Sequence, residues 1–173
     1  MNIDTYNLPS GTLGLHPEEF YGAMGRIVCV SAVLEDKITS LRHTLGHVEQ
    51  GLFTHEPVSQ QITEARRLSR DLPPPVPDQV GAFLSRAKDA FAKRNEFVHS
   101  SFPFQPSGKV FGHRPARSKD VTDGTADVVE TSVDEMKLFI GELAELVQGF
   151  KPTLRAVLQH QDPAPARLTN VTS

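Results

Sequence analysis

The chain has 173 residues, 38% of them hydrophobic, and a formal net charge of −3 at pH 7. This length suits one domain with a buried core, and the acidic balance excludes a surface that is basic throughout. The single cysteine, Cys29, excludes an intrachain disulfide framework and fits a reducing compartment. The chain has no apolar run long enough to span a bilayer and no signal-peptide pattern at its start. We therefore expect a cytoplasmic protein without membrane association.

The first third of the chain has the pattern of one long helix. After an expected N-terminal extension of residues 1–16, Pro17 suits a first helical turn, and Glu18 and Glu19 suit the positive end of the helix dipole. Apolar residues then recur alternately four and three positions apart, and Gly51 is the expected stop. This seam consists of Phe20, Met24, Ile27, Ser31, Leu34, Ile38, Leu41, Leu45, Val48 and Leu52.

Two more helices are expected on either side of a proline cluster. The apolar residues of the second are Val58, Ile62, Ala65, Leu68 and Leu72. The prolines between 73 and 77 end it, because proline lacks the backbone N–H that a helix needs. The third helix begins near Asp78, a good N-cap, and ends around Ser100 or Ser101, before Pro103. Its apolar stripe consists of Val80, Phe83, Leu84, Ala87, Phe91 and Val98.

Residues 102–131 contain too many prolines and glycines for a helix. Within them, 109–112 and 126–130 predict a small β-hairpin. A capping box from Ser132 to Glu135 then opens a last helix, and residues 161–173 are expected to form a polar tail. The pattern predicts an all-α fold. Its architecture is an antiparallel bundle of four main helices, with an irregular loop or small β-hairpin before the last helix, in one domain of residues 17–160.

The end of the third helix holds the residues that bear most directly on function. Arg94 is followed by the polar Asn95, and His99 comes five positions after Arg94. On an ideal helix Arg94 lies within the apolar stripe, while Asn95 and His99 lie together along one edge of it. A guanidinium on a packing face is costly unless a bound anion or a partner neutralises it. The stretch 81–119 has eight cations and two acids, which suits a polyanionic ligand.

This order of arginine, polar residue and histidine resembles the signature of the HEPN superfamily. The resemblance implies a helical bundle with the motif near the end of a later helix. It also implies a metal-independent endoribonuclease of the toxin or defence type, without a cofactor. Arg94, Asn95 and His99 are the catalytic residues that it implies. The basic character of Lys93, His113 and Arg114 predicts contacts with the RNA substrate.

Cleavage of RNA by its own 2′-hydroxyl needs one group to accept a proton, another to donate one, and a cation for the phosphate. The motif supplies one histidine per chain, so counting predicts a homodimer with a composite site, as the resemblance also implies. The products would be a 2′,3′-cyclic phosphate and a 5′-hydroxyl. Some HEPN toxins have a tyrosine two residues after the histidine, which an antitoxin modifies. Ser101 stands there in this chain, which argues against that control, although an antitoxin or regulatory protein stays among the expected partners.

Other interpretations of these residues stay open. Arg94 could pair with Glu35 or Asp36 across the bundle while His99 caps the helix end. The chain would then be a plain helical scaffold. A separate alternative is a non-catalytic HEPN-like helical dimer in which Arg94 binds nucleotide, RNA or a partner protein. The same spacing also occurs from Arg42 to His47 and from Arg155 to His160. His43 and His47 are spaced like a metal-binding pair but lack a nearby third ligand, so no metal site is expected.

Overall fold

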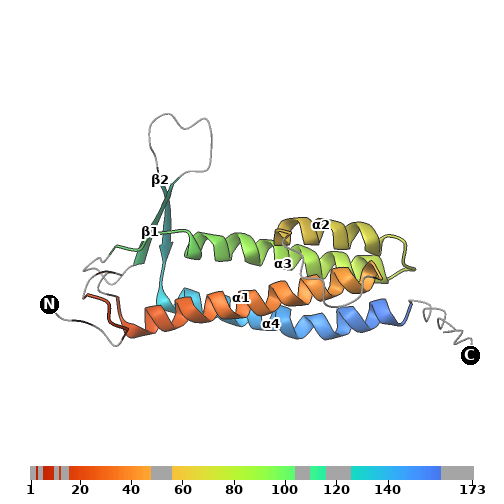
Figure 1. The fold of residues 1–173 in the computed structure, drawn as a ribbon, viewed down its shortest axis with the longest axis horizontal. Helices are drawn as coiled ribbons and strands as arrows, with labels where there is room; N and C mark the ends of the chain where they lie inside the picture. The colour runs from red at the N-terminus through yellow and green to blue at the C-terminus, as the bar shows by residue number, and fades with distance from the viewer. Residues whose placement is uncertain are drawn as a thin grey trace, which may run out of the picture.

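The computed structural model describes residues 3, 6–9, 12, 16–47, 56–103, 110–115 and 126–160, with the backbone alone at 114, 115, 126 and 127. Within these residues it contains four helices and a two-stranded hairpin (Figure 1). The elements are α1 (Glu18–Leu45), α2 (Val58–Ser69), α3 (Val76–Val98), β1 (Val110–Pro115), β2 (Ala126–Thr131) and α4 (Val133–Leu158). The predicted fold class is therefore confirmed. The expected tail of residues 161–173 and the seam residues Val48 and Leu52 lie outside the described residues.

Local chemistry explains where the helices begin and end. α4 begins at the predicted capping box, where the backbone N–H of Glu135 donates to Oγ of Ser132 at 3.2 Å. α1 ends at Leu45 with Gly46 as its C-cap, and the next residue, His47, has a left-handed φ of 51°, so the helix stops before the expected Gly51. α3 begins at Val76, slightly before the predicted start, because the fixed φ of Pro77 suits its first turn.

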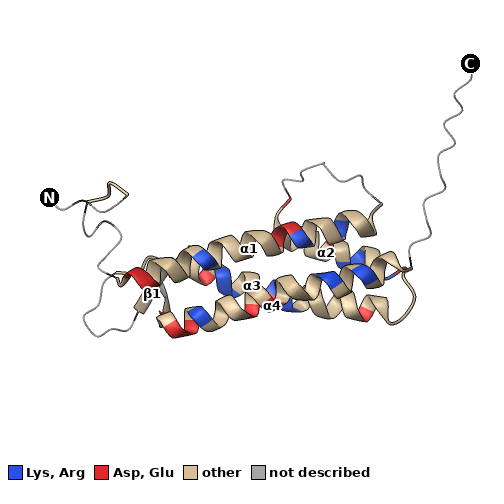
Figure 2. Cartoon of the chain, turned by 90° about the horizontal axis from the view of Figure 1, so that it is seen from below, with Lys and Arg blue, Asp and Glu red and all other residues tan. Residues whose placement is uncertain are grey.

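Helix α3 is the antiparallel member of the bundle, since α1 and α4 both run in the direction opposite to it (Figure 1). Two ion pairs join α3 to α4: Arg86 to Glu145 at 3.5 Å and Lys93 to Glu142 at 3.4 Å. Residue numbers rise along one helix as they fall along the other, which fixes the antiparallel arrangement. Both signs of charge are interspersed along the helices (Figure 2).

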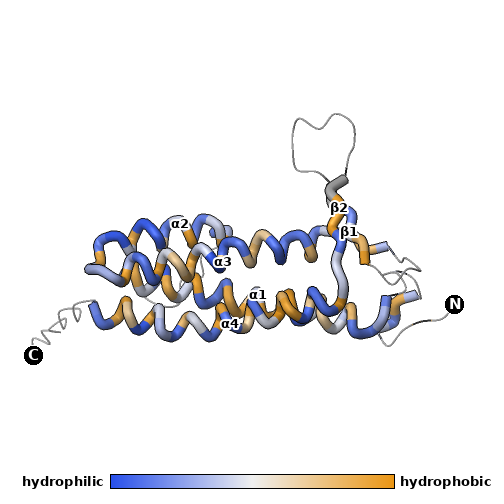
Figure 3. The backbone as a smooth tube through the Cα atoms, turned by 180° about the vertical axis from the view of Figure 1, so that it is seen from behind, coloured by the Kyte–Doolittle hydropathy of each residue, from blue (hydrophilic) through white to orange (hydrophobic). Residues whose placement is uncertain are grey.

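Helix α2 is short, with 12 residues against 28 in α1, and it lies at only one end of the bundle (Figures 1 and 3). Oγ1 of Thr39 donates to Oε1 of Gln61 at 2.6 Å, which places α2 beside the C-terminal part of α1. The C-terminal half of α3, which holds the arginine-histidine motif, extends beyond α2.

The predicted hairpin is confirmed, with a first strand that is longer than expected. β1 and β2 pair antiparallel, from Val110 opposite Thr131 to Pro115 opposite Ala126. Lys109, the expected first residue, lies outside the described residues. A further bridge joins Ser101, just after α3, to His113 of β1. The chain after α3 therefore pairs with the free edge of the hairpin.

The core is aliphatic with scattered phenylalanines, as the composition indicates. Ser31, the polar member of the α1 seam, is buried, and its hydroxyl donates to the carbonyl of Ile27. In α3, Phe97 is buried and its ring stacks on Phe139 with the centroids 5.6 Å apart. Phe97 was not part of the predicted apolar stripe, because that stripe did not include the side of α3 that packs against α4. Among the described residues, no helix combines the length and hydropathy needed to cross a membrane.

Candidate functional site

The guanidinium of Arg94 is held by its neighbour in the helix. Nη1 of Arg94 donates to Oδ1 of Asn95 at 3.1 Å, and both residues are half-buried. Because Asn95 lies about 100° around the helix from Arg94, this bond turns the guanidinium from the centre of the packing face toward the edge that also holds His99. The amide NH2 of Asn95 makes no hydrogen bond with the described residues and is free to donate.

Arg94 is a partly buried cation without a carboxylate partner among the described residues. Its Nε is buried and makes no hydrogen bond. The alternative pairing with Glu35 or Asp36 does not form: both acids are exposed, and Asp36 instead lies 3.2 Å from Lys37. A guanidinium in this state retains an uncompensated positive charge and unused donors, which is what an incoming phosphate requires.

His99 occupies the C-cap position of α3. Its backbone N–H donates to the carbonyl of Asn95 at 3.1 Å, while its side chain is exposed. The helix therefore ends at Val98, slightly before the predicted end at Ser100 or Ser101, and the motif lies at its C-terminal end as predicted. The cap is made by the backbone, so the imidazole is left free of that role. The three motif residues thus lie within the last two turns of one helix, with His99 at the solvent boundary.

The residues that follow His99 are fixed against the hairpin. Ser101 and His113 exchange both backbone hydrogen bonds, with N···O distances of 3.0 and 2.8 Å. Gly112 lies so close to this segment that a Cβ there would be 2.8 Å from Cβ of Ser100 and 2.6 Å from Cε1 of Phe102. The structure thus brings His113, predicted as a substrate contact, next to the motif, through contacts between segments that are separate in the sequence.

His16, which the sequence did not indicate as a site residue, also holds the loop after His99 in place. Its Nε2 lies 2.7 Å from the carbonyl oxygen of Phe102, and its ring stacks on Phe20 with the centroids 4.3 Å apart. Phe20 also meets Phe102 edge to face at 5.4 Å. These contacts hold the loop after His99 against the start of α1. The partners are 86 residues apart, so local periodicity carries no signal for them.

The other predicted substrate contacts are placed differently. Lys93 faces α4, where its Nζ lies 3.4 Å from Glu142 and 4.7 Å from the ring centroid of Phe139. Its charge is therefore already engaged on a side of α3 away from Asn95. The backbone of Arg114 lies in β1 beside His113, and its side chain is outside the described residues.

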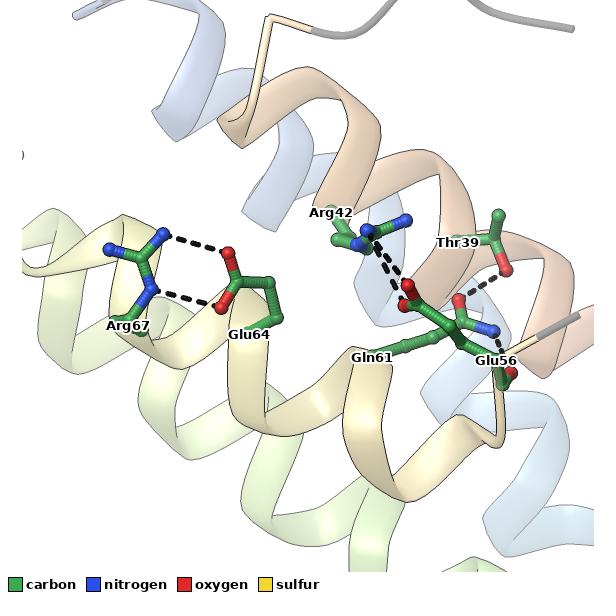
Figure 4. A network of polar contacts seen from close by, with 6 residues as sticks. All are labelled: Thr39, Arg42, Glu56, Gln61, Glu64 and Arg67. Atoms are coloured by element: carbon green, nitrogen blue, oxygen red, sulfur yellow. Dashed lines mark hydrogen bonds and ion pairs between the residues drawn. The ribbon is translucent and has the colours of Figure 1, made fainter. Parts of the chain in front are cut away.

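The two other matches to the motif spacing lie in different surroundings. Arg42 is neutralised by Glu56 at 3.4 Å (Figure 4) and borders a surface cavity of about 530 Å³ between α1 and α2. In the same network Arg67 donates to both carboxylate oxygens of Glu64, and these hydrogen bonds lower the pKa of Glu64. Arg155 and His160 are exposed at the end of α4. Neither match combines a partly buried, unpaired guanidinium with a free histidine.

His43 and His47, which are spaced like a metal-binding pair, differ in burial. His43 is 5% exposed and its Nε2 has no hydrogen bond, whereas His47 is exposed. Among the described residues there is no group of three or more His, Cys, Asp or Glu side chains placed to hold a metal ion.

Comparisons with known proteins identify no relative of this chain. Neither the protein-family models, nor the curated proteins, nor the solved structures give a match to this chain.

Proposed function

We propose that the protein is a metal-independent endoribonuclease of the HEPN toxin or defence type, acting on cytoplasmic RNA. The observation that carries the proposal is the state of Arg94, a half-buried guanidinium without a carboxylate partner among the described residues. Asn95 turns it toward the edge of α3 that ends in the exposed His99. A phosphate-binding cation and a proton-transfer group thus lie within the last two turns of one helix.

The reaction follows from what these groups can do. The 2′-oxygen of a ribose forms a bond to the adjacent phosphorus while the bond from phosphorus to the 5′-oxygen breaks. One group accepts the proton of the 2′-hydroxyl, another gives a proton to the leaving 5′-oxygen, and Arg94 stabilises the charge on the phosphoryl oxygens. The free amide of Asn95 orients the phosphate. The products are a 2′,3′-cyclic phosphate and a 5′-hydroxyl.

The reaction needs two proton-transfer groups, and the motif has one histidine. With one motif histidine in each chain, a homodimer that brings together two copies of His99 would supply both proton-transfer groups. An antitoxin or regulatory protein that covers the same end of the bundle is the partner expected for an enzyme of this type. Both partners belong to the proposal.

The test is RNA cleavage by purified protein in the presence of EDTA. His99→Ala and Arg94→Ala should each lower the cleavage rate by about 100-fold or more. Arg155→Ala and His160→Ala are matched controls, because they remove an arginine and a histidine of the same spacing from an exposed helix end. Circular dichroism verifies that every variant is folded. Cleavage that persists in His99→Ala, or that stops in EDTA, would reject the proposal.

The alternative is a non-catalytic bundle that uses Arg94 to bind nucleotide, RNA or a partner protein. It predicts RNA binding without product. Arg94→Ala would then weaken binding, whereas His99→Ala would leave it nearly unchanged. Binding and cleavage measured on the same two variants separate the alternatives.

A further inference from the structure

A second histidine lies at the motif, on the same chain. His113 of β1 and His99 are both exposed. His113 pairs with Ser101, which follows His99 by two residues. Ser101 and His113 exchange two backbone hydrogen bonds and therefore sit directly opposite one another.

The alternation of side chains places His113 on the open face of this pairing. The Cβ position of Gly112 points at Ser100 and Phe102, so these three residues share the inner face. Successive residues of an extended chain point to opposite faces. Ser101 and His113 therefore share the outer face, and both are exposed, as is Val128, which lies opposite His113 on β2.

The distance between the two histidines has an upper bound. Directly opposite residues of a hydrogen-bonded antiparallel pair have Cα atoms about 5.5 Å apart, and two steps along a chain span at most about 7 Å. The Cα atoms of His99 and His113 are thus no more than about 13 Å apart. Two imidazoles that extend from these positions can both reach the oxygens of one phosphodiester.

We propose that His113 is the second proton-transfer group of the site, supplied by the same chain as His99; this inference rests on the proposed ribonuclease activity and assigns to His113 the role that counting gave to the second copy of His99 in a homodimer. One imidazole takes the proton of the 2′-hydroxyl as the 2′-oxygen bonds to phosphorus. The other, as imidazolium, gives its proton to the 5′-oxygen as the bond from phosphorus to that oxygen breaks. The site is then complete within one chain, and a second copy is not needed for chemistry.

The deciding experiment compares single-turnover RNA cleavage by wild type, His99→Ala and His113→Ala. The proposal expects both variants to lose about 100-fold or more in rate, and free imidazole to restore part of the lost rate in each. Rescue by imidazole separates a proton carrier from a merely structural residue. Val128→Ala, which removes the exposed side chain opposite His113, is the matched control and should cleave at the wild-type rate.

Two outcomes would overturn the proposal while the endoribonuclease assignment stands. One is a His113→Ala variant that cleaves within threefold of wild type while His99→Ala is inactive, which excludes His113 as the second proton-transfer group. The other is recovery of activity on mixing His99→Ala with His113→Ala, which shows that the two imidazoles come from different chains. A mixture that stays inactive supports the proposal.

A binding measurement tests the inference even if the wild-type protein cleaves no RNA. The ring-proton resonances of His99 and His113 should both shift on addition of a 2′-deoxy dinucleotide, which cannot be cleaved, while those of His160 should not. Joint shifts without cleavage would retain the two-histidine phosphate site and reject the proposed enzyme. A shift of His99 alone would reject the inference.

Discussion

Arg94 donates a hydrogen bond to the side chain of its own neighbour, Asn95, at 3.1 Å, while its Nε is buried without a partner. A side chain needed only for packing at this position would be apolar, because leaving a buried donor unsatisfied costs about 1–3 kcal/mol. The guanidinium is thus kept at a cost in stability, and residues kept at such a cost concentrate at functional sites.

Replacing Arg94 with leucine should therefore raise stability while abolishing RNA cleavage. We expect a gain of about 1 kcal/mol in the free energy of unfolding, since leucine removes the unsatisfied donor and keeps an apolar side chain on the packing face. Urea denaturation measures it. Arg155→Leu, on the exposed end of α4, should change stability by less than about 0.5 kcal/mol. A large loss of stability in Arg94→Leu would mean that the guanidinium supports the fold.

Gly112 should not tolerate even one methyl group. A Cβ there would lie 2.6 Å from Cε1 of Phe102 and 2.8 Å from Cβ of Ser100, so the loop that follows His99 must move. We expect Gly112→Ala to cost about 1–3 kcal/mol, as overpacking does, and to slow cleavage as His99 is displaced. Gly25→Ala is the control: its Cβ would meet nothing within 4 Å, and removing a helical glycine should stabilise by about 0.5–1 kcal/mol. Equal effects at the two glycines would contradict this account.

His16 should affect cleavage without touching the substrate. Its Nε2 bonds to the carbonyl of Phe102 at 2.7 Å and its ring stacks on Phe20. Loss of the bond and the stacking in His16→Ala should cost about 1–3 kcal/mol. His16→Gln, which keeps a side-chain donor, should recover part of that stability. Thermal melts and cleavage rates measured together test this, and cleavage should fall in parallel with stability. Full activity in His16→Ala would show that the loop keeps its position unaided.

The sequence was sufficient to predict those features that depend on local periodicity. The seam of α1, the capping box at Ser132 and the proline cluster before α3 each have a short-range cause, and the helices appear where these signals place them. The end of α3 at Val98 falls within three residues of the predicted end at Ser100 or Ser101, because the chain that follows is rich in helix breakers.

Contacts between distant segments were beyond sequence reasoning. His16 lies in what was expected to be an extension, and the hydrogen bond from its ring spans 86 residues. The pairing of Ser101 with His113 is likewise a tertiary feature, and an exposed strand histidine has no distinctive pattern. The count of charges in residues 81–119 likewise could not show which cations are already paired. Arg86 and Lys93 contribute to that count, yet both pair with acids of α4.

The Glu64 carboxylate gives the structure a pH-dependent contact at the other end of the bundle. Arg67 donates to it at 2.9 and 2.7 Å and so lowers its pKa. The stabilising contribution is therefore present above the ordinary carboxyl pKa and is lost as the pH falls through the lowered pKa. Arg67→Ala should raise the pKa of Glu64 in a carboxyl NMR titration. Because the pair is exposed, the difference should shrink in high salt. An unchanged titration would contradict the contact.

The last prediction concerns Lys93, which was expected to contact RNA. Its ammonium lies 3.4 Å from Glu142 and over the ring of Phe139, so α4 already engages its charge. Lys93→Ala should therefore change RNA affinity by less than about twofold, since an exposed ion pair of this kind contributes about 0–1 kcal/mol and adds little to the field at the motif. Glu142→Gln should instead release the ammonium and tighten RNA binding at low salt, with a steeper dependence on salt concentration. Filter-binding titrations at two salt concentrations measure both effects. If Lys93→Ala weakened binding as strongly as Arg94→Ala, the lysine would have to leave Glu142 when RNA binds, and the phosphate path would then include the side of α3 that faces α4.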